Sequence, residues 1–310
     1  MTIEETLALL RENDRFNIIT HIRPDGDTIG SASALCYALR KIGKTAHLYN
    51  NPQFVDSYEW VAEPYIAPEG FVPGFTICVD MADSSLYPEG FEGAADLCID
   101  HHPSNSHFAN NTLLWADRAS CGEIIMALVK ELCGLDPTVA DLLYVAVSTD
   151  TGCFVYGNTS GETLRAASEL CFAGARNAYL NKVLFRTNSK ARLALEAQIL
   201  SSFRYYHEGK TVISVVTKEM LEKAGAVERD TQDIAALPGR VEGAFTSITV
   251  KEIDAKRCKI SVRTNGVVDA NKVCAKFGGG GHKMAAGCSM DSSCQEAPDI
   301  LAEIIALEYK

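Results

Sequence analysis

The stretch Phe16–Lys41, FNIITHIRPDGDTIGSASALCYALRK, decides the fold class of this chain. Its first five residues, Phe16–Thr20, are mostly apolar and predict a short strand. Residues Thr28–Lys41 have the apolar spacing of a helix. Because a strand that leads into a helix is the repeating unit of an α/β sheet, we expect parallel strands.

The same alternation continues through the N-terminal half of the chain. Short apolar runs predict further strands at Thr45–Tyr49, Phe75–Asp80 and Asp96–Asp100. Helical patterns follow at Ser120–Cys133 and Thr138–Val147. The predicted fold class is therefore α/β with a mostly parallel sheet, and ligands of such sheets bind beyond the carboxyl ends of the strands.

The chain has 310 residues, which is enough for two domains. The segment Lys190–Tyr206 has a helical pattern without turn residues and is expected to bridge them. We expect a catalytic N-terminal domain at 1–186, a linker helix at 187–206 and a smaller α/β domain at 207–310. The elements predicted in this last domain are strands Thr211–Val216, Phe245–Glu252 and Cys258–Arg263, and helices Lys218–Ala224, Ala270–Phe277 and Ala297–Glu308.

Composition narrows the classes of protein further. Hydrophobic residues make up 47% and charged residues 22%, which is typical of a globular protein. The net charge of −11 argues against a long basic groove for duplex nucleic acid. One segment, Lys251–Lys283, differs because it carries eight basic and three acidic residues, so a small anion could bind there.

The location of the protein is also constrained by the sequence. No apolar stretch approaches the ~20 residues of a membrane span, and the N-terminus does not resemble a signal peptide. The eleven cysteines are odd in number and include no CxxC pair. We therefore expect a reduced, cytoplasmic protein without membrane contact.

Ionisable side chains gather where the predicted elements end. They are His21, Asp25, Asp27, Asp80, Asp100, His101, His102 and Asp150. Taken singly, each cluster has a simpler interpretation, since Asp25 and Asp27 could cap a helix and the two adjacent histidines could lie in a surface turn. Asp83 is expected to be such a cap. Taken together, the clusters meet at one edge of an α/β sheet.

This set of side chains is rich in carboxylates and contains no cysteine. Such ligands favour Mn²⁺, with Mg²⁺ or Co²⁺ as alternatives, over zinc. Two ions roughly 3.5–4 Å apart, bridged by a carboxylate, are the usual apparatus for in-line attack on phosphorus. The residues alone therefore indicate a two-metal phosphoester hydrolase.

The clusters resemble, in order, the four motifs of the DHH phosphoesterase superfamily. The motifs read HxxPDGDxxGS from His21, an aspartate at a strand end (Asp80), DHHP from Asp100 and STDTG from Ser148. The C-terminal part resembles the DHH-associated substrate domain. The residues that carry this second resemblance are Val262-Arg263-Thr264, Val268–Phe277 and Gly278–Gly287. Within the superfamily, the length of the chain is similar to that of the nanoRNases, which are oligoribonucleases and 3′-phosphoadenosine-5′-phosphate (pAp) phosphatases. One departure is Cys121-Gly122, which interrupts a helix start that otherwise fits the family.

The resemblance implies a role for each candidate residue. One metal ion would be held by His21, Asp25 and Asp80, and the second by Asp27, Asp80, His101 and Asp150, with Asp80 as the bridge. The catalytic His102 would face the scissile phosphate, and Asp100 would orient a neighbouring histidine. In the second domain, the substrate's terminal phosphate would be bound by Arg263, Gly278, Gly279, Gly280, Gly281 and His282.

The expected function is the degradation of very short RNA oligonucleotides to mononucleotides and the dephosphorylation of pAp to AMP. One alternative is a phosphodiesterase for linear or cyclic dinucleotides such as pGpG or pApA. An alternative of another class is a catalytically inactive nucleotide- or RNA-binding module. The expected partners are the substrates themselves. The sequence leaves open whether two copies of the chain form a homodimer.

Overall fold

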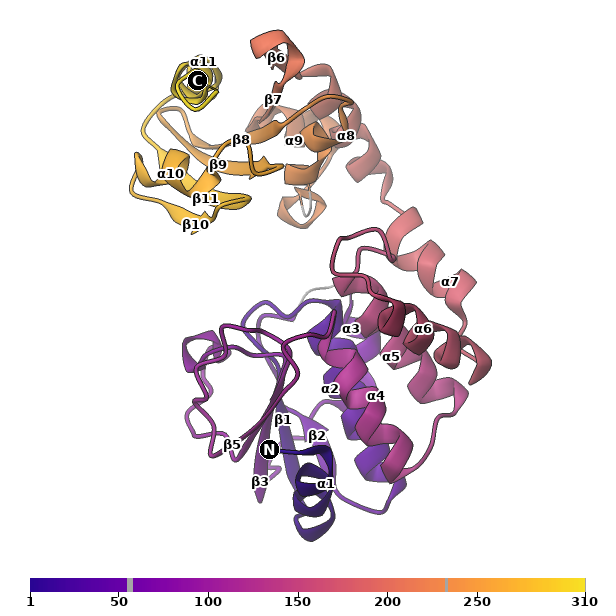
Figure 1. Cartoon of the computed structure of the whole chain (residues 1–310). Helices are drawn as coiled ribbons and strands as arrows, with labels where there is room; N and C mark the ends of the chain where they lie inside the picture. The colour runs from indigo at the N-terminus through magenta and orange to yellow at the C-terminus, as the bar shows by residue number, and fades with distance from the viewer. Residues whose placement is uncertain (55–57, 232–233, 310) are drawn as a thin grey trace. The chain divides into compact units, whose positions relative to one another are not determined.

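The computed structural model describes residues 1–54, 58–231 and 234–309. Its chain forms two compact units, Met1–Thr187 and Asn188–Lys310, which are described separately below (Figure 1). None of the helices in the described ranges is long and apolar enough to cross a membrane.

Five parallel strands form the sheet of the first unit, in the order β2-β1-β3-β4-β5. Their bounds are β1 Phe16–Ile19, β2 Ala46–Leu48, β3 Phe75–Val79, β4 Leu97–Asp100 and β5 Asn111–Leu114. The predicted parallel α/β fold is confirmed, with β5 as an additional strand. Because β2 and β3 lie on opposite sides of β1, the chain order reverses there, and such a switch point opens a crevice at the carboxyl ends of the strands.

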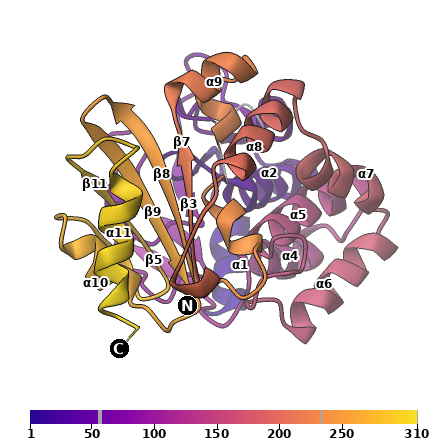
Figure 2. The same ribbon diagram turned by 90° about the horizontal axis from the view of Figure 1, so that it is seen from above.

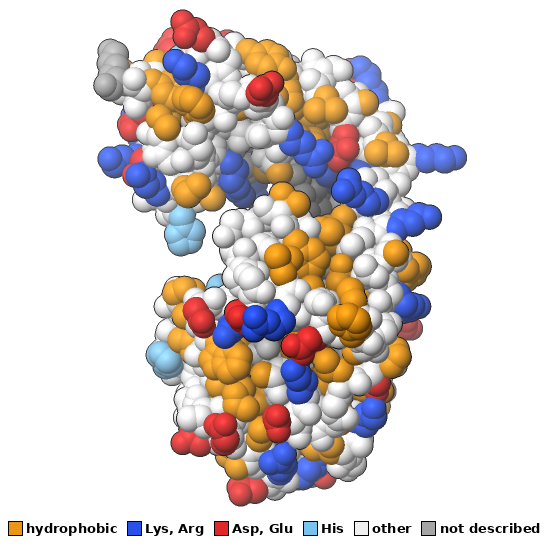
Figure 3. Space-filling view, turned by 45° about the vertical axis from the view of Figure 1, so that its right-hand side comes forward, with side chains coloured by type: hydrophobic (Ala, Val, Ile, Leu, Met, Phe, Trp, Pro, Cys, Tyr) orange, Lys and Arg blue, Asp and Glu red, His pale blue; other side chains and the backbone are white. Residues whose placement is uncertain are grey.

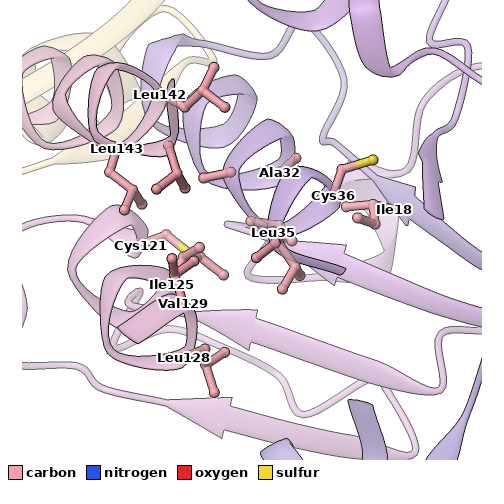
Figure 4. Packing of buried hydrophobic residues seen from close by; sticks show 14 of the residues in the cluster. Ile18, Ala32, Leu35, Cys36, Cys121, Ile125, Leu128, Val129, Leu142 and Leu143 are labelled. Atoms are coloured by element: carbon pink, nitrogen blue, oxygen red, sulfur yellow. The ribbon is translucent and has the colours of Figure 1, made fainter. Parts of the chain in front are cut away.

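Helices cover one face of this sheet. The helices of the first unit are α1 Ile3–Glu12, α2 Gly26–Lys41, α3 Glu59–Ala62, α4 Cys121–Leu132, α5 Pro137–Asp150, α6 Gly161–Phe172 and α7 Asn177–Asn181. Helices α2, α4 and α5 contribute most of the core beside the strands. Figure 4 shows Leu35 of α2, Ile125 of α4 and Leu143 of α5 converging there, and all three are fully buried.

The other face of the sheet is covered by irregular chain. Ile19, Cys78 and Cys98 point to this face and are fully buried. Tyr87 and Phe91, which follow β3 in the chain, pack on it with their rings edge to face, 4.9 Å apart. The sheet is therefore largely buried on both sides, while the ends of its strands remain open for a site.

The second unit has a mixed sheet of six strands in the order β10-β11-β9-β8-β7-β6, in which only β7 and β8 pair in parallel. The strands are β6 Arg204–Tyr206, β7 Thr211–Val216, β8 Thr246–Asp254, β9 Arg257–Thr264, β10 Gly280–His282 and β11 Ala285–Met290. The helices are α8 Lys190–Ser201, α9 Lys218–Ala224, α10 Ala270–Ala275 and α11 Ala297–Ala306. Helices α10 and α11 contribute to the core on one face of the sheet, and Figure 2 shows α11 running along β9 and β11.

The structure differs from the sequence prediction in two places. The helix predicted at Lys190–Tyr206 ends at Ser201, because Arg204–Tyr206 pairs with β7 as strand β6. No strand was predicted at the glycine run, but Gly280–His282 pairs with β11 as β10, after Gly278 and Gly279. In both places the backbone N–H and C=O groups pair with a neighbouring strand. The local sequence pattern does not reveal that neighbour.

Candidate metal centre

Three adjacent strands and helix α5 end, and helix α2 begins, at the same place in the first unit. His21 follows β1, Asp80 follows β3, and Asp100 closes β4 ahead of His101 and His102. The first turn of α2 adds Asp27 after its N-cap Asp25, and α5 ends on Asp150. The structure therefore brings together every metal ligand proposed from the sequence. Asp25 has both expected features, since it caps α2 and also lies beside His21.

Asp80 lies at the centre of this group. Its backbone has a left-handed conformation with φ of 58°, which is costly for a residue other than glycine. This turn directs the carboxylate inward, where its Oδ2 accepts a hydrogen bond of 2.7 Å from Thr28 Oγ1. The other oxygen, Oδ1, is buried and accepts no hydrogen bond from the described residues. A buried carboxylate oxygen without a donor is expensive, and a bound cation would satisfy it.

One candidate metal site lies between β1 and β3. His21 Nε2 is 3.9 Å from Asp80 Oδ2 and 4.0 Å from Asp25 Oδ1. His21 Nδ1 lies 2.9 Å from the carbonyl oxygen of Ile22, so it carries the proton and leaves Nε2 free as a ligand. The three ligand atoms lie within 4.8 Å of one another.

A second candidate site shares Asp80 and lies toward α5. His101 Nε2 is 3.4 Å from Asp80 Oδ1, 3.9 Å from Asp27 Oδ2 and 3.7 Å from Asp150 Oδ2. The carbonyl oxygen of Arg118 accepts a 3.1 Å hydrogen bond from His101 Nδ1, which again leaves Nε2 for a ligand role. The two groups together make a cradle of carboxylate oxygens and imidazole nitrogens, a donor set that suits a hard or borderline divalent ion.

Asp27 is held by the start of helix α4, a contact that the sequence did not reveal. The backbone N–H groups of Cys121 and Gly122 donate to its two oxygens at 2.7 and 3.0 Å. Free N–H groups at a helix N-terminus favour an anion. A Cβ at Gly122 would lie 2.6 Å from Cβ of Ala146, so glycine allows α4 to approach α5. The backbone of Cys121-Gly122, the pair that departs from the usual family pattern, therefore holds Asp27, one of the candidate metal ligands.

Glycines also bring α2 close to α5. A Cβ at Gly30 would lie 2.6 Å from the carbonyl oxygen of Leu142, and one at Gly26 would lie 2.5 Å from the Thr149 side chain. Because neither position has a Cβ, the first turn of α2 lies against the last turn of α5. That contact is what places Asp27 beside Asp150.

Asp100 and His102 form a separate pair. Asp100 is fully buried, and its Oδ1 is 2.7 Å from His102 Nδ1. Its Oδ2 accepts a 2.6 Å hydrogen bond from Asn105, a residue whose role no sequence pattern indicated. The His102 side chain is 43% exposed, so its ring is fixed at one nitrogen and open to solvent elsewhere. Asp83 caps a short turn by accepting from the N–H of Ser85, which confirms the simpler interpretation of that residue.

Burial and mutual repulsion dominate the electrostatics of the centre. Burial, together with the charges of Asp80 and Asp150, raises the pKa of Asp27 well above its usual value. Burial raises the pKa of Asp150 to about 6, although the nearby His101 opposes this. Burial works against protonation of His101, but Asp80 and Asp27 raise its pKa to about 10. Several carboxylates thus compete for too few positive charges, which again fits a site for cations.

The predicted phosphate-binding residues lie on the second unit. Across the sheet, His282 pairs with Ala285 and Ala285 pairs with Arg263, so these three side chains share one face. Arg263 and His282 are exposed, and the small Ala285 lies between them. The structure therefore places the predicted clamp on one row of the sheet, at the strand that carries Gly280 and Gly281.

Comparison with known proteins identifies the family. The model of the DHH family N-terminal domain matches residues 15–147, and that of the DHHA1 domain matches residues 208–308. A Thermus thermophilus protein named bifunctional oligoribonuclease and PAP phosphatase NrnA is 34% identical over 281 residues, which cover 88% of this chain and 83% of that protein. This chain belongs to the DHH family.

Two further comparisons cover almost the whole chain. A Bacillus subtilis protein, also named bifunctional oligoribonuclease and PAP phosphatase NrnA, is 28% identical over 98% of this chain and 97% of its own. Among solved structures, an exopolyphosphatase-related protein from Bacteroides fragilis has the same fold, with a TM-score of 0.86 and 23% identity over 99% of this chain and 97% of that one.

Proposed function

We propose that this DHH-family protein is a two-metal phosphohydrolase that degrades very short RNA to mononucleotides and removes the 3′-phosphate of pAp. The relatives that carry both activities in their names match nearly the whole chain, including both domains. The observation that carries the proposal is Asp80, whose two oxygens belong to two adjacent groups of metal-ligand side chains.

The distances between side-chain atoms divide the proposed ligands into two groups. His21, Asp25 and Asp80 would hold one ion, and Asp27, Asp80, His101 and Asp150 the other. We propose Mn²⁺, because carboxylates dominate the donor set. When bound, such ions activate water at neutral pH and neutralise charge on the phosphoryl group.

The remaining side chains of the centre are His102, which would act on the substrate, and Asp100, which holds His102. His102 can donate a proton to the leaving oxygen, or a hydrogen bond to the phosphoryl oxygens, because its ring is exposed. Asp100 is a positioning residue, since its bond to Nδ1 fixes the orientation of the ring and raises the pKa of His102. This pair keeps the proton donor oriented before substrate arrives.

The exposed row on the second unit would bind the far phosphate of the substrate. Arg263 and His282 supply positive charge and hydrogen-bond donors, and Gly280 leaves backbone groups accessible. A single clamp of this kind selects short substrates that end in a phosphate. On the face drawn in Figure 3, Lys and Arg side chains lie among Asp and Glu side chains.

Release of phosphate and mononucleotides in the presence of Mn²⁺ tests the proposal. The substrates are pAp, a labelled RNA dimer, an RNA 24-mer, pGpG and pyrophosphate. Turnover of pAp and the dimer, with little turnover of the others, is expected. Asp80→Ala should abolish it, whereas Asp83→Ala, which alters only a nearby cap, should not. Preference for pGpG would support the dinucleotide alternative, and binding without any turnover would support the inactive module.

A further inference from the structure

The first unit has a cavity that the proposed function does not use. Its volume is about 680 Å³, which lies within the range of small-molecule sites. It opens beside strand β1 and is bordered by the chain that follows β2, the chain that precedes β3 and the chain that follows β3. None of the described residues that line it is a candidate metal ligand.

The innermost part of the cavity carries an amide group. Asn17 is the one buried residue among those described that line the cavity, and it points to the same face of the sheet as Ile19, because side chains alternate along a strand. Although Asn17 is only 7% exposed, its side-chain oxygen and nitrogen have no hydrogen-bond partner among the described residues. A buried amide without a partner costs free energy. A polar group of a ligand would therefore be stabilised there.

Aromatic side chains line the cavity further out. They are Tyr49, Phe71 and Phe91, and all three are half-buried. The rings of Tyr49 and Phe91 pack edge to face with their centroids 5.5 Å apart, and Phe71 packs on His47 of β2 at 4.7 Å. Rings held in this way bind methylene groups by hydrophobic contact and attract cations. The cavity thus suits a ligand with an apolar body.

The charged side chains of the lining are all negative. Glu69 and Glu92 come from different loops, are exposed, and form no ion pair or hydrogen bond with other described residues. No Lys, Arg or His from the described ranges lines the cavity; Arg40 contacts the neighbouring His47 but lies outside the lining. Unpaired carboxylates attract cations and repel phosphates, so this is not a second nucleotide site.

We propose that this cavity binds an aliphatic polyamine, a linear molecule whose ammonium groups are separated by methylene chains. One ammonium group would donate a charge-assisted hydrogen bond to the Asn17 oxygen. The methylene groups would lie along the aromatic rings, and a second ammonium group would pair with Glu69 and Glu92 at the opening. The inference does not depend on the proposed function, because the cavity and the metal centre share no residue.

The metal centre is the competing site for a cation, since it is also rich in carboxylates. Asn17 precedes His21 by four residues, which is ~13 Å along an extended chain. The test is therefore made with Mn²⁺ present and repeated with Asp80→Asn. This change alters both groups of metal ligands and no residue of the cavity.

Calorimetric titration of the full-length chain with spermidine tests the inference. One molecule should bind per chain, both with Mn²⁺ and in Asp80→Asn, whereas the neutral hexanediol should not bind. Asn17→Leu, which has nearly the same volume, should weaken spermidine binding by about 10-fold or more, because one charge-assisted hydrogen bond is lost.

Changes at the opening give a second measurement that does not touch the core. Glu69→Gln and Glu92→Gln should each weaken spermidine binding by about 2–5-fold, since exposed ion pairs contribute little, and added salt should reduce this effect. Glu89→Gln is the matched control, because Glu89 is exposed, lies beside the same loop and does not line the cavity. It should leave the affinity unchanged.

Four results would overturn the inference. Loss of binding with Mn²⁺ or in Asp80→Asn would assign spermidine to the metal centre. An equal loss in Glu89→Gln would show general attraction to an acidic surface. Unchanged affinity in Asn17→Leu and in both glutamine variants would place the polyamine elsewhere. Binding of adenosine in place of spermidine would show that the cavity recognises a neutral base. Spermidine binding without any pAp turnover would count against the proposed function alone.

Discussion

The two candidate regions of this chain handle charge in opposite ways. Asp27, Asp80 and Asp100 of the first unit are almost completely buried, and one carboxylate oxygen lacks any donor among the described residues. On the second unit, Arg263 and His282 are exposed and lie on either side of the small Ala285. The free energy of folding must offset the repulsion in the first region, because like charges are forced together there.

This difference in burial fits the two tasks proposed for the two regions, which are catalysis and phosphate binding. A centre that stabilises a transition state must hold its groups in place before substrate binds, and burial does so. A clamp for a terminal phosphate needs only reach and charge, which an exposed strand provides. Changes in the first region should therefore act on kcat, and changes in the second on KM.

The largest effect is expected for Asp80→Asn. This change keeps the size of the side chain but removes the charge shared by both candidate metal sites. We expect kcat for pAp to fall by about 10³-fold or more, beyond the loss of a single transition-state donor. The measurement is phosphate release with Mn²⁺, together with the amount of metal bound. Activity within tenfold of the unaltered protein would remove Asp80 from the centre.

A smaller effect is expected for Asp100→Asn, which loosens His102 without removing it. Loss of a supporting partner of this kind typically costs about 10–100-fold in activity. The loss should appear in kcat, with KM for pAp unchanged. Asp83→Asn is the matched control, because that side chain only caps a turn. An equal loss in the control would show that the effect is one of folding.

Arg263→Ala tests the other region. Loss of one charge-assisted hydrogen bond to phosphate should raise KM for pAp by about 10-fold or more, with kcat nearly unchanged. Arg257→Ala, on the same strand and equally exposed, should leave KM unaltered. A fall in kcat without a rise in KM would contradict the assignment of Arg263 to binding.

The smallest effect concerns the end of α5 remote from Asp150. Asp136 caps this helix and accepts a hydrogen bond from Tyr37, and it also contacts Lys41. Although burial opposes it, the bonds from Lys41 and Tyr37 lower the pKa of Asp136 from 3.8 to about 2. Asp136→Asn should lower the free energy of unfolding by about 1 kcal/mol and leave pAp turnover unchanged.

The sign of the pH dependence follows from that lowered pKa. Because the folded value lies below the unfolded one, Asp136 stabilises the fold fully above about pH 4 and loses its contribution as the pH falls toward 2. Denaturant titrations at neutral pH and near pH 2 measure both limits. A difference between the two proteins that does not shrink at low pH would contradict this origin.

The sequence predicted the parallel sheet, and the family it indicated is confirmed by comparison with relatives. It also predicted which side chains would meet at the centre, because His21, Asp80 and Asp100 each follow an apolar run that reads as a strand. A pattern of this kind is set by residues that are near one another along the sequence. For the same reason the pattern failed at β6 and β10, which exist only because a partner strand is adjacent.

The sequence by itself determined the kinds of candidate ligand in the centre and their positions at the ends of strands and helices. Only the tertiary structure decided how they are held: Asp80 in a left-handed turn, Asp27 on the amides of α4, and the row formed by His282, Ala285 and Arg263. Each of these contacts joins residues that are distant along the chain or depends on a backbone angle, and neither leaves a periodic signal in the sequence.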